Sequence, residues 1–252
     1  WPVWDLLRPH AAQVLAHARE RQIAEAGSLS RLSTALSLLL CARSLYREAE
    51  PLMHSVLKLD QTLFGRESRA VAVGLLNLGE LFRRTGRTDE AEPLLRRSIN
   101  IYSTVCGESS LEVCQAVNSL ALILMDRQQW TEAEGMLRKA LAKDEERKEE
   151  TGRSVTRDLH NLAFLLASTG RASEAEPLIR RSLKIGLQVH GENDPKTARK
   201  SQILAGILRD LGRSDEAEPL ARKALEIFEQ VLGPEHPLTQ SARKDLLSLT
   251  PT

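Results

Sequence analysis

A repeat with a fixed period of 42 residues is the feature that most constrains this sequence. The tetrapeptide Glu-Ala-Glu-Pro, with Gly replacing Pro once, begins at residues 48, 90, 132, 174 and 216. A leucine recurs at the same step, and the residue after it is always small; these pairs are Leu36 and Ser37, Leu78 and Gly79, Leu120 and Ala121, Leu162 and Ala163, and Leu204 and Ala205. A constant period without insertions indicates one supersecondary unit stacked five times.

Each repeat contains the pattern of two helices. In the second repeat, apolar residues spaced for one helical face predict a first helix from about Val71 to Arg84. Gly86 follows it and is suited to a left-handed C-cap. A second helix is predicted from Thr88 or Asp89 to about Thr104. A capping box is expected at its start in four repeats, from Asp89, Thr131, Ser173 and Asp215, each with a Glu three residues later.

The small residues of the repeat are expected to serve packing rather than chemistry. Gly79 and Ala91 fall where the two helices of one repeat cross, and their lack of bulk allows a close approach. The pattern predicts an all-α fold, a right-handed superhelical solenoid of helix-turn-helix repeats.

Composition and charge narrow the functional classes. Hydrophobic residues make up 42% and charged residues 27%, which is typical of a folded domain. The net charge of +1 gives no general attraction to nucleic acid or to an anionic membrane, and neither is expected as a partner. No run of 18 apolar residues predicts a membrane span. Three cysteines without metal-ligand spacing favour a reducing, cytoplasmic location.

The repeat resembles the tetratricopeptide family. The residues that carry the likeness are Leu78-Gly79, Phe82, Gly86, Ala91, Leu95 and Ile99. The segments Leu76–Gly79 and Leu232–Pro237 are similar to the 42-residue variant found in kinesin light chains and in many bacterial proteins. The sequence departs from that pattern at Ser37, Ser44, Gln128 and Gly135, and in the charged loop Glu145–Arg153, which is expected to be mobile or partly helical.

The resemblance divides the chain into three parts. Residues 1–29 are expected to form a capping helix and a junction to an upstream domain, residues 30–236 the five repeats, and residues 237–252 a C-terminal capping helix. The start, Trp1 to His10, resembles the junction after the nucleotide-binding module of bacterial NB-ARC/STAND-type proteins. Trp1 and Trp4 are therefore expected to pack on the first repeat or on that upstream domain.

Signatures of catalysis are missing from the sequence. It has no Gly-x-x-x-x-Gly-Lys-Ser/Thr phosphate loop, no Gly-x-Ser-x-Gly and no His-Glu-x-x-His. Its six histidines are scattered, and the Glu-x-Glu pairs are read as residues of helix starts. We therefore expect no enzymatic activity, no catalytic residues, no cofactor and no metal site.

The resemblance implies a peptide-binding groove on the first helices of the repeats. Asparagine can hold a peptide backbone, and arginine can hold a carboxylate by two hydrogen bonds. The excess of arginine over acidic residues on this face indicates an acidic ligand. The candidate groove residues are Asn77, Glu80, Arg83, Arg84, Gln115, Asn118, Leu122, Arg157, His160, Asn161, Phe164, Arg199, Gln202 and Arg209.

The predicted function is that of a non-catalytic protein- or peptide-binding scaffold, the ligand-sensing region of a larger STAND-type protein. The alternatives are a stand-alone scaffold or kinesin-light-chain-like cargo adaptor, and an enzyme with an unrecognised site. Arg157→Ala and Asn161→Ala are expected to weaken ligand binding without a large change in melting temperature, because exposed residues carry little stability.

Overall fold

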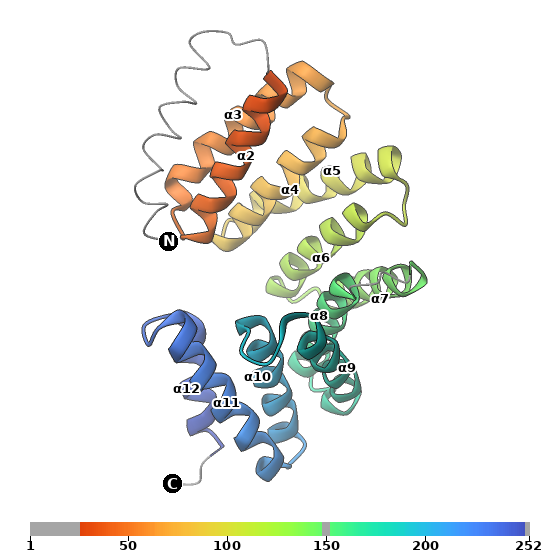
Figure 1. Cartoon of the computed structure of the whole chain (residues 1–252). Helices are drawn as coiled ribbons and strands as arrows, with labels where there is room; N and C mark the ends of the chain where they lie inside the picture. The colour runs from red at the N-terminus through yellow and green to blue at the C-terminus, as the bar shows by residue number, and fades with distance from the viewer. Residues whose placement is uncertain (1–25, 148–151, 250–252) are drawn as a thin grey trace. The chain divides into compact units, whose positions relative to one another are not determined.

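The computed structural model describes residues 26–147 and 152–249, and this part of the chain is helical without strands. Trp1, Trp4 and nearly all of the predicted N-terminal cap lie outside the described residues. The helices follow one another in chain order (Figure 1). They are α2 (Ala26–Ala42), α3 (Tyr46–Phe64), α4 (Arg69–Arg84), α5 (Thr88–Cys106), α6 (Leu111–Asp126), α7 (Trp130–Glu146), α8 (Arg153–Ser168), α9 (Ala172–His190), α10 (Pro195–Asp210), α11 (Ser214–Leu232) and α12 (Pro237–Leu247).

The chain divides into two compact units, residues 1–123 and residues 124–252. In the first unit, α2 packs on α3, α3 on α4, and α4 on α5. In the second unit, each helix from α7 to α12 packs on the next one along the chain, and the first helices α8, α10 and α12 are neighbours in that order. This pairing confirms the all-α helical-repeat fold class.

The core follows the repeating columns of the sequence. Leu78, Leu120, Leu162 and Leu204 are each 1% exposed, and the alanine of every Glu-Ala-Glu element is fully buried. At Gly79, an added Cβ would lie 2.8 Å from the Leu95 side chain, which is closer than van der Waals contact. The small positions are therefore required by the helix crossing, as the sequence pattern predicted.

Overpacking of this crossing is the first testable consequence. Ala175 is 0% exposed at the start of α9. Ala175→Leu should lower the free energy of unfolding by roughly 1–3 kcal/mol, because no space exists for three more carbon atoms. Denaturant titration of the variant measures this loss. Ala142→Leu, at an exposed position of α7, is the control and should change stability less; equal losses in both variants would contradict the assignment of the crossing.

The turns inside the repeats need a left-handed residue after the first helix. Gly86, Gly170 and Gly212 supply it, with φ angles of 78°, 77° and 76°. Ser44 and Gln128 occupy the same turn position with φ of 60°. These two departures from the repeat pattern thus keep the backbone conformation of glycine at a conformational cost, because a side chain is strained in the left-handed region.

Replacing Gln128 by glycine should stabilise the protein. Gln128→Gly removes a left-handed side chain, and the expected gain is about 0.5–1 kcal/mol after the extra chain entropy of glycine is subtracted. The neighbouring Gln129 has a φ of −85°, so Gln129→Gly serves as the control and should not stabilise. Thermal unfolding of both variants makes the comparison, and a gain at residue 129 instead of residue 128 would contradict it.

The second helices are capped differently from the prediction. The prediction of a capping box at Asp89, Thr131, Ser173 and Asp215 is wrong. The helices α5, α7, α9 and α11 begin one residue before these positions. Their N-cap residues are Arg87, Gln129, Arg171 and Arg213, and none of these makes a side-chain capping bond. Instead, the arginine N-cap binds a glutamate three residues later. Arg171 donates from Nε and Nη2 to the two Glu174 oxygens, each at 2.7 Å.

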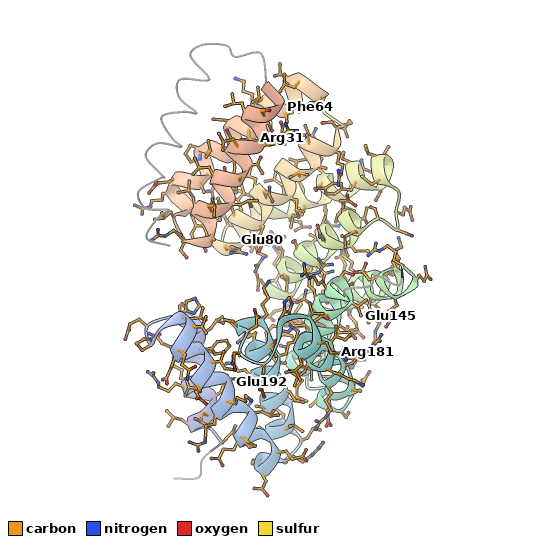
Figure 2. All side chains as sticks on the ribbon, in the orientation of Figure 1. Arg31, Phe64, Glu80, Glu145, Arg181 and Glu192 are labelled. Carbon is orange, nitrogen blue, oxygen red and sulfur yellow. The ribbon has the colours of Figure 1, made fainter. Side chains whose placement is uncertain are left out.

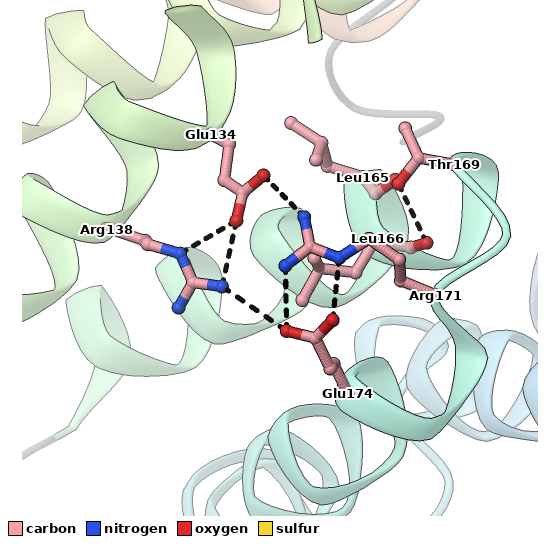
Figure 3. A network of polar contacts seen from close by, with 7 residues as sticks. All are labelled: Glu134, Arg138, Leu165, Leu166, Thr169, Arg171 and Glu174. Carbon is pink, nitrogen blue, oxygen red and sulfur yellow. Dashed lines mark hydrogen bonds and ion pairs between the residues drawn. The ribbon is translucent and has the colours of Figure 1, made fainter. Parts of the chain in front are cut away.

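The same arginines also join consecutive repeats. Arg171 donates from Nη1 to Glu134 of the preceding repeat at 2.7 Å, and Arg138 donates to Glu134 at 2.9 Å (Figure 3). Arg87 with Glu50 and Arg213 with Glu176 repeat the arrangement at 2.8 Å, always across 37 residues. Further ion pairs connect neighbouring second helices, such as Glu145 of α7 with Arg181 of α9 (Figure 2). We call the contacts of Arg87 with Glu50, Arg171 with Glu134 and Arg213 with Glu176 the arginine clamp.

The remaining predictions concern the irregular segments. The loop predicted over Glu145–Arg153 is helical at both ends, since α7 continues to Glu146 and α8 begins at Arg153; residues 148–151 lie outside the described residues. In the segment predicted as a C-terminal capping helix, residues 237–247 form α12, which occupies the position of a sixth first helix, and its Leu247 is 68% exposed. Within the described residues, no helix is both long enough and apolar enough to cross a bilayer.

Candidate functional site

The predicted groove residues lie on the first helices α4, α6, α8 and α10. Their environments differ sharply. Arg84 and Phe164 are exposed, whereas Asn118, Asn161 and Gln202 are buried, with 2%, 8% and 3% of their surface accessible. The others are half-buried.

On α4 of the first unit, the predicted charges bind one another. Glu80 accepts hydrogen bonds from Arg83 at 2.8 and 3.0 Å and from Arg84 at 3.0 Å. Burial raises the pKa of Glu80, but the hydrogen bonds and charges of these two arginines outweigh it and hold the pKa below its usual value. Asn77 lies half-buried beside this cluster on the same helix. The two arginines therefore carry much less uncompensated charge than their number suggests.

The predicted residues of α6 are only partly available. Asn118 donates from Nδ2 to the backbone oxygen of Cys114 at 2.9 Å and is nearly inaccessible. Gln115 and Leu122 are half-buried. An amide that bonds its own helix and has no exposed surface serves the fold, so Gln115 and Leu122 are the more accessible candidates on α6.

In the second unit, four predicted residues meet around one cavity. Phe164 of α8 and Arg199, Gln202 and Arg209 of α10 line a space of about 300 Å³. Phe164 is 40% exposed, so an apolar surface is available next to charged and amide groups. We call this space the Phe164 cavity.

The helix α12 contributes two residues that the sequence analysis missed. Ser241 and Asp245 also line the Phe164 cavity, and Gln202 donates from Nε2 to Asp245 at 2.5 Å and to Ser241 at 3.3 Å. Their positions in a sixth first-helix, in line with the groove positions of the repeats, were the signal that could have identified them.

Arg157 and Asn161 of α8 prove to be poor test residues for an open groove. Arg157 donates from Nε to Asp158 at 3.2 Å and lies 3.6 Å from Asp144. Both aspartates are fully buried, and so, nearly, is Asn161. Substitution of either residue is therefore expected to change stability, in contrast to the prediction from the sequence, because Asn161 is buried and Arg157, although 32% exposed, contacts buried carboxylates.

Near the beginning of α8 and α10 lies a second and larger cavity of about 540 Å³, also within the second unit. His160 and Arg157 line it, and Arg199 lines both cavities. Burial, together with the charges of Lys200 and Arg199, lowers the pKa of His160 to about 3. We call this space the His160 cavity.

Lys200 is the most unusual residue of the His160 cavity, and the sequence analysis did not select it. It is 6% exposed. The same column of the other repeats contains Leu32, Gly74, Ala116, Asp158 and Ala242, so a lysine in a column that is small at three of these five positions was a usable signal.

The side chains that line the two cavities are of types that can hold a ligand. Among the described residues, no group of three His, Cys, Asp or Glu side chains is arranged to hold a metal ion. None of the three cysteines forms a disulfide in the described part of the chain, and Cys114 is buried. The two cavities are lined by guanidinium, ammonium, imidazole, amide and aromatic side chains, among others, which suit hydrogen bonding and apolar contact with a ligand.

Comparison with known proteins agrees with the repeat architecture. Models of the tetratricopeptide repeat match residues 28–104, 112–185 and 203–238. No curated protein matches the chain.

Solved structures with the same fold come from several sources. BtubC (BKLC) from P. vanneervenii has a TM-score of 0.74 and 24% identity over 92% of this chain and 93% of that one. A putative kinesin light chain from Podospora anserina has a TM-score of 0.64 and 20% identity, with coverage of 81% and 97%. The Rap regulator of plasmid pLS20, in complex with the Phr* peptide, has a TM-score of 0.70 and 16% identity, with coverage of 86% and 59%.

The family models cover more than half of the chain, and the helix pairs, glycine turns and small crossing residues found in the structure are those expected of such repeats. The chain therefore belongs to the tetratricopeptide repeat family.

Proposed function

We propose that this protein is a non-catalytic scaffold that binds a peptide or protein segment along its first helices. The observation that carries the proposal is the Phe164 cavity, where an exposed aromatic ring lies beside Arg199, Arg209 and Gln202. An aromatic anchor flanked by hydrogen-bonding side chains is the combination that usually dominates binding energy at interfaces. The Rap regulator, which shares the fold, is a peptide complex, and this supports the same type of ligand here.

The charge of the ligand is the finer part of the proposal. We expect an acidic segment, but the arginines that would bind it are fewer than the sequence suggested. Arg209 pairs with Asp210 at 2.9 Å, whereas Arg199 has a hydrogen bond to the neutral amide of Gln202. Arg199 is thus the best placed cation for an acidic side chain at the Phe164 cavity.

Binding at this cavity is tested with a matched pair of variants. Phe164→Ala should reduce partner capture from a lysate of the source cells at least about tenfold, because it removes a central apolar anchor. Leu187→Ala on α9 removes a side chain of similar exposure, 42% against 40%, from a second helix. It should leave capture unchanged. Equal capture by both variants, or a loss only with Leu187→Ala, would place the binding surface elsewhere.

The role of this chain within a larger protein and its location in the cell are separate proposals. A role as the sensor region of a STAND-type protein is supported by the likeness of residues 1–10 to such junctions, and a cytoplasmic location by the sparse cysteine content. A stand-alone scaffold or cargo adaptor is the alternative, favoured by the likeness to a putative kinesin light chain. Sequencing the complete gene decides between them through the presence or absence of an upstream nucleotide-binding domain.

A further inference from the structure

The His160 cavity differs from the rest of the first-helix surface in its charge. Its walls include the side chains of Arg153, Arg157, Lys196, Arg199 and Lys200, together with three histidines, and no carboxylate lines it. Of the five cations, Arg157 is bound by Asp158 and Asp144. No ion pair within 4 Å is found in the described residues for the other four.

Lys200 is built into this cavity at a cost to the fold. Burial lowers the pKa of its ammonium group, which donates to the backbone oxygen of Lys196 at 3.1 Å. Gly186 provides the room, since a Cβ added there would lie 3.2 Å from Cδ of Lys200. The equivalent residues of the other repeats are Asp60, Tyr102, Asp144 and Phe228. A buried cation without a carboxylate partner destabilises a protein, so this pair of residues indicates a ligand that supplies the negative charge.

His160 provides an independent indication. Its Nδ1 atom is inaccessible and has no hydrogen-bond partner in the described part of the chain. Buried polar atoms are normally bonded, so an unpartnered one beside a cavity marks a place where a ligand or water completes the hydrogen bonds.

The backbone adds to the positive potential of the site. The lining residues of α8 and α10 belong to the first two turns of these helices, and His236 is the N-cap of α12. Helix N-termini carry partial positive charge and attract anions. Besides the two aspartates bound to Arg157, opposing charges come from Asp194, which accepts a hydrogen bond from the backbone N–H of Lys196, and from Asp245, whose charge acts on Arg199. They do not cancel four cations and three helix ends.

The volume of the cavity and its apolar walls indicate what the ligand contains besides the anion. A phosphate ion has the bulk of a few water molecules, each about 30 Å³, and would leave most of the 540 Å³ empty. Pro195, Leu232 and Leu238 give the cavity apolar walls. The ligand should therefore combine a multiply charged anion with an apolar body.

We propose that the His160 cavity binds a phosphomonoester carried on an apolar body, namely a phosphorylated aromatic side chain of a peptide partner. A phosphomonoester carries almost two negative charges and three acceptor oxygens near neutral pH, which fits several unpaired cations better than one carboxylate does. The peptide source rests on the proposed scaffold function, since Arg199 also lines the Phe164 cavity. The phosphate chemistry does not depend on that function.

Calorimetric titration of the full chain with small probes tests the chemistry. Phenyl phosphate should bind at least about tenfold more tightly than benzoate or inorganic phosphate, because only it offers both charge and body. In NMR spectra, the imidazole signals of His160 should shift on addition of phenyl phosphate. Equal affinities for phenyl phosphate and benzoate would overturn the proposal, as would an unperturbed His160.

Three lysine variants locate the site. Lys200→Met keeps the aliphatic stem and should weaken phenyl phosphate binding about tenfold or more, with the melting temperature unchanged or raised. Lys196→Met, at an exposed position, should weaken binding without any concern for folding. Lys184→Met on the exposed surface of α9, outside the cavity, is the control. Unchanged affinity in both cavity variants would overturn the proposal.

A blocked phosphotyrosine tripeptide identifies the source of the phosphate. Binding tighter than that of phenyl phosphate supports a peptide ligand. Binding of phenyl phosphate without the tripeptide would overturn the peptide source and assign the cavity to a free phosphomonoester. Phe164→Ala should leave phenyl phosphate binding intact, because Phe164 does not line the His160 cavity. Failure of this proposal is thereby distinguished from failure of the scaffold function.

Discussion

Arg157→Ala is expected to lower the free energy of unfolding by about 3 kcal/mol, the range found when one partner of a buried ion pair is removed. Asp158 and Asp144 are both 0% exposed, and Arg157 contacts each of them. Asp144 would keep its ion pair with Arg147. Asp158 would lose the charge of Arg157, and its desolvation would no longer be compensated by that guanidinium.

A second substitution separates the loss of the ion pair from the loss of packing. Asp158→Asn in the Arg157→Ala background should recover at least about 1 kcal/mol, because an amide is less costly to bury than an unpaired carboxylate. Urea unfolding of the two single variants and the double variant provides the cycle. Arg180→Ala, which breaks an exposed pair with Glu176 on α9, is the control and should have a small effect. Additive losses without recovery would contradict the ion-pair explanation.

Acid should destabilise the protein through His160. Burial and the neighbouring cations place its pKa at about 3, compared with 6.5 for the unperturbed group. Between these values the unfolded chain binds more protons than the folded one, so stability falls as pH decreases through that window. From pH 7 to pH 4.5 this single group should remove about 2.5 kcal/mol, at 1.36 kcal/mol per pKa unit.

The contribution of His160 is isolated by comparison with His160→Gln, which cannot titrate. Wild type and variant should both lose stability in acid, since other groups also bind protons, but the wild type should lose about 2.5 kcal/mol more by pH 4.5. Denaturant titrations in a buffer without phosphate measure the difference. Parallel losses in wild type and His160→Gln would show that the imidazole is solvated.

Much of the fold could be predicted from the sequence because its determinants are local. Gly86 marks the turn, and the end of α4 at Arg84 agrees with the predicted end. The start of α5 at Thr88 also agrees with the prediction, but its capping interaction was less accessible to sequence reasoning. Arg87 stabilises it through Glu90 and through Glu50 of the preceding repeat, and a contact across 37 residues leaves no short motif.

The candidate site was harder to predict because the burial of a side chain depends on the neighbouring helices. Asn118 and Gln202 lie at groove positions by sequence alignment, yet adjacent helices cover both. The opposite error was made with Lys200, which was not selected from the sequence although it lines the His160 cavity. It occupies a column that is small in most repeats, and only Gly186, 14 residues earlier on another helix, explains how its stem fits. Such paired exceptions become visible only when two columns are placed in contact.

The arginine clamp has a consequence for how such arrays change in length during evolution. Arg171 pairs with Glu134 before it and Glu174 after it. Recombination that removed residues 172–213 would join Arg171 to Ser214 and bring Glu216 to the position that Glu174 now occupies. Both contacts would survive, so whole repeats can be lost or duplicated with intact junctions. The same event would delete Gly186 and Lys200 together, so the array would remain folded while the His160 cavity was lost.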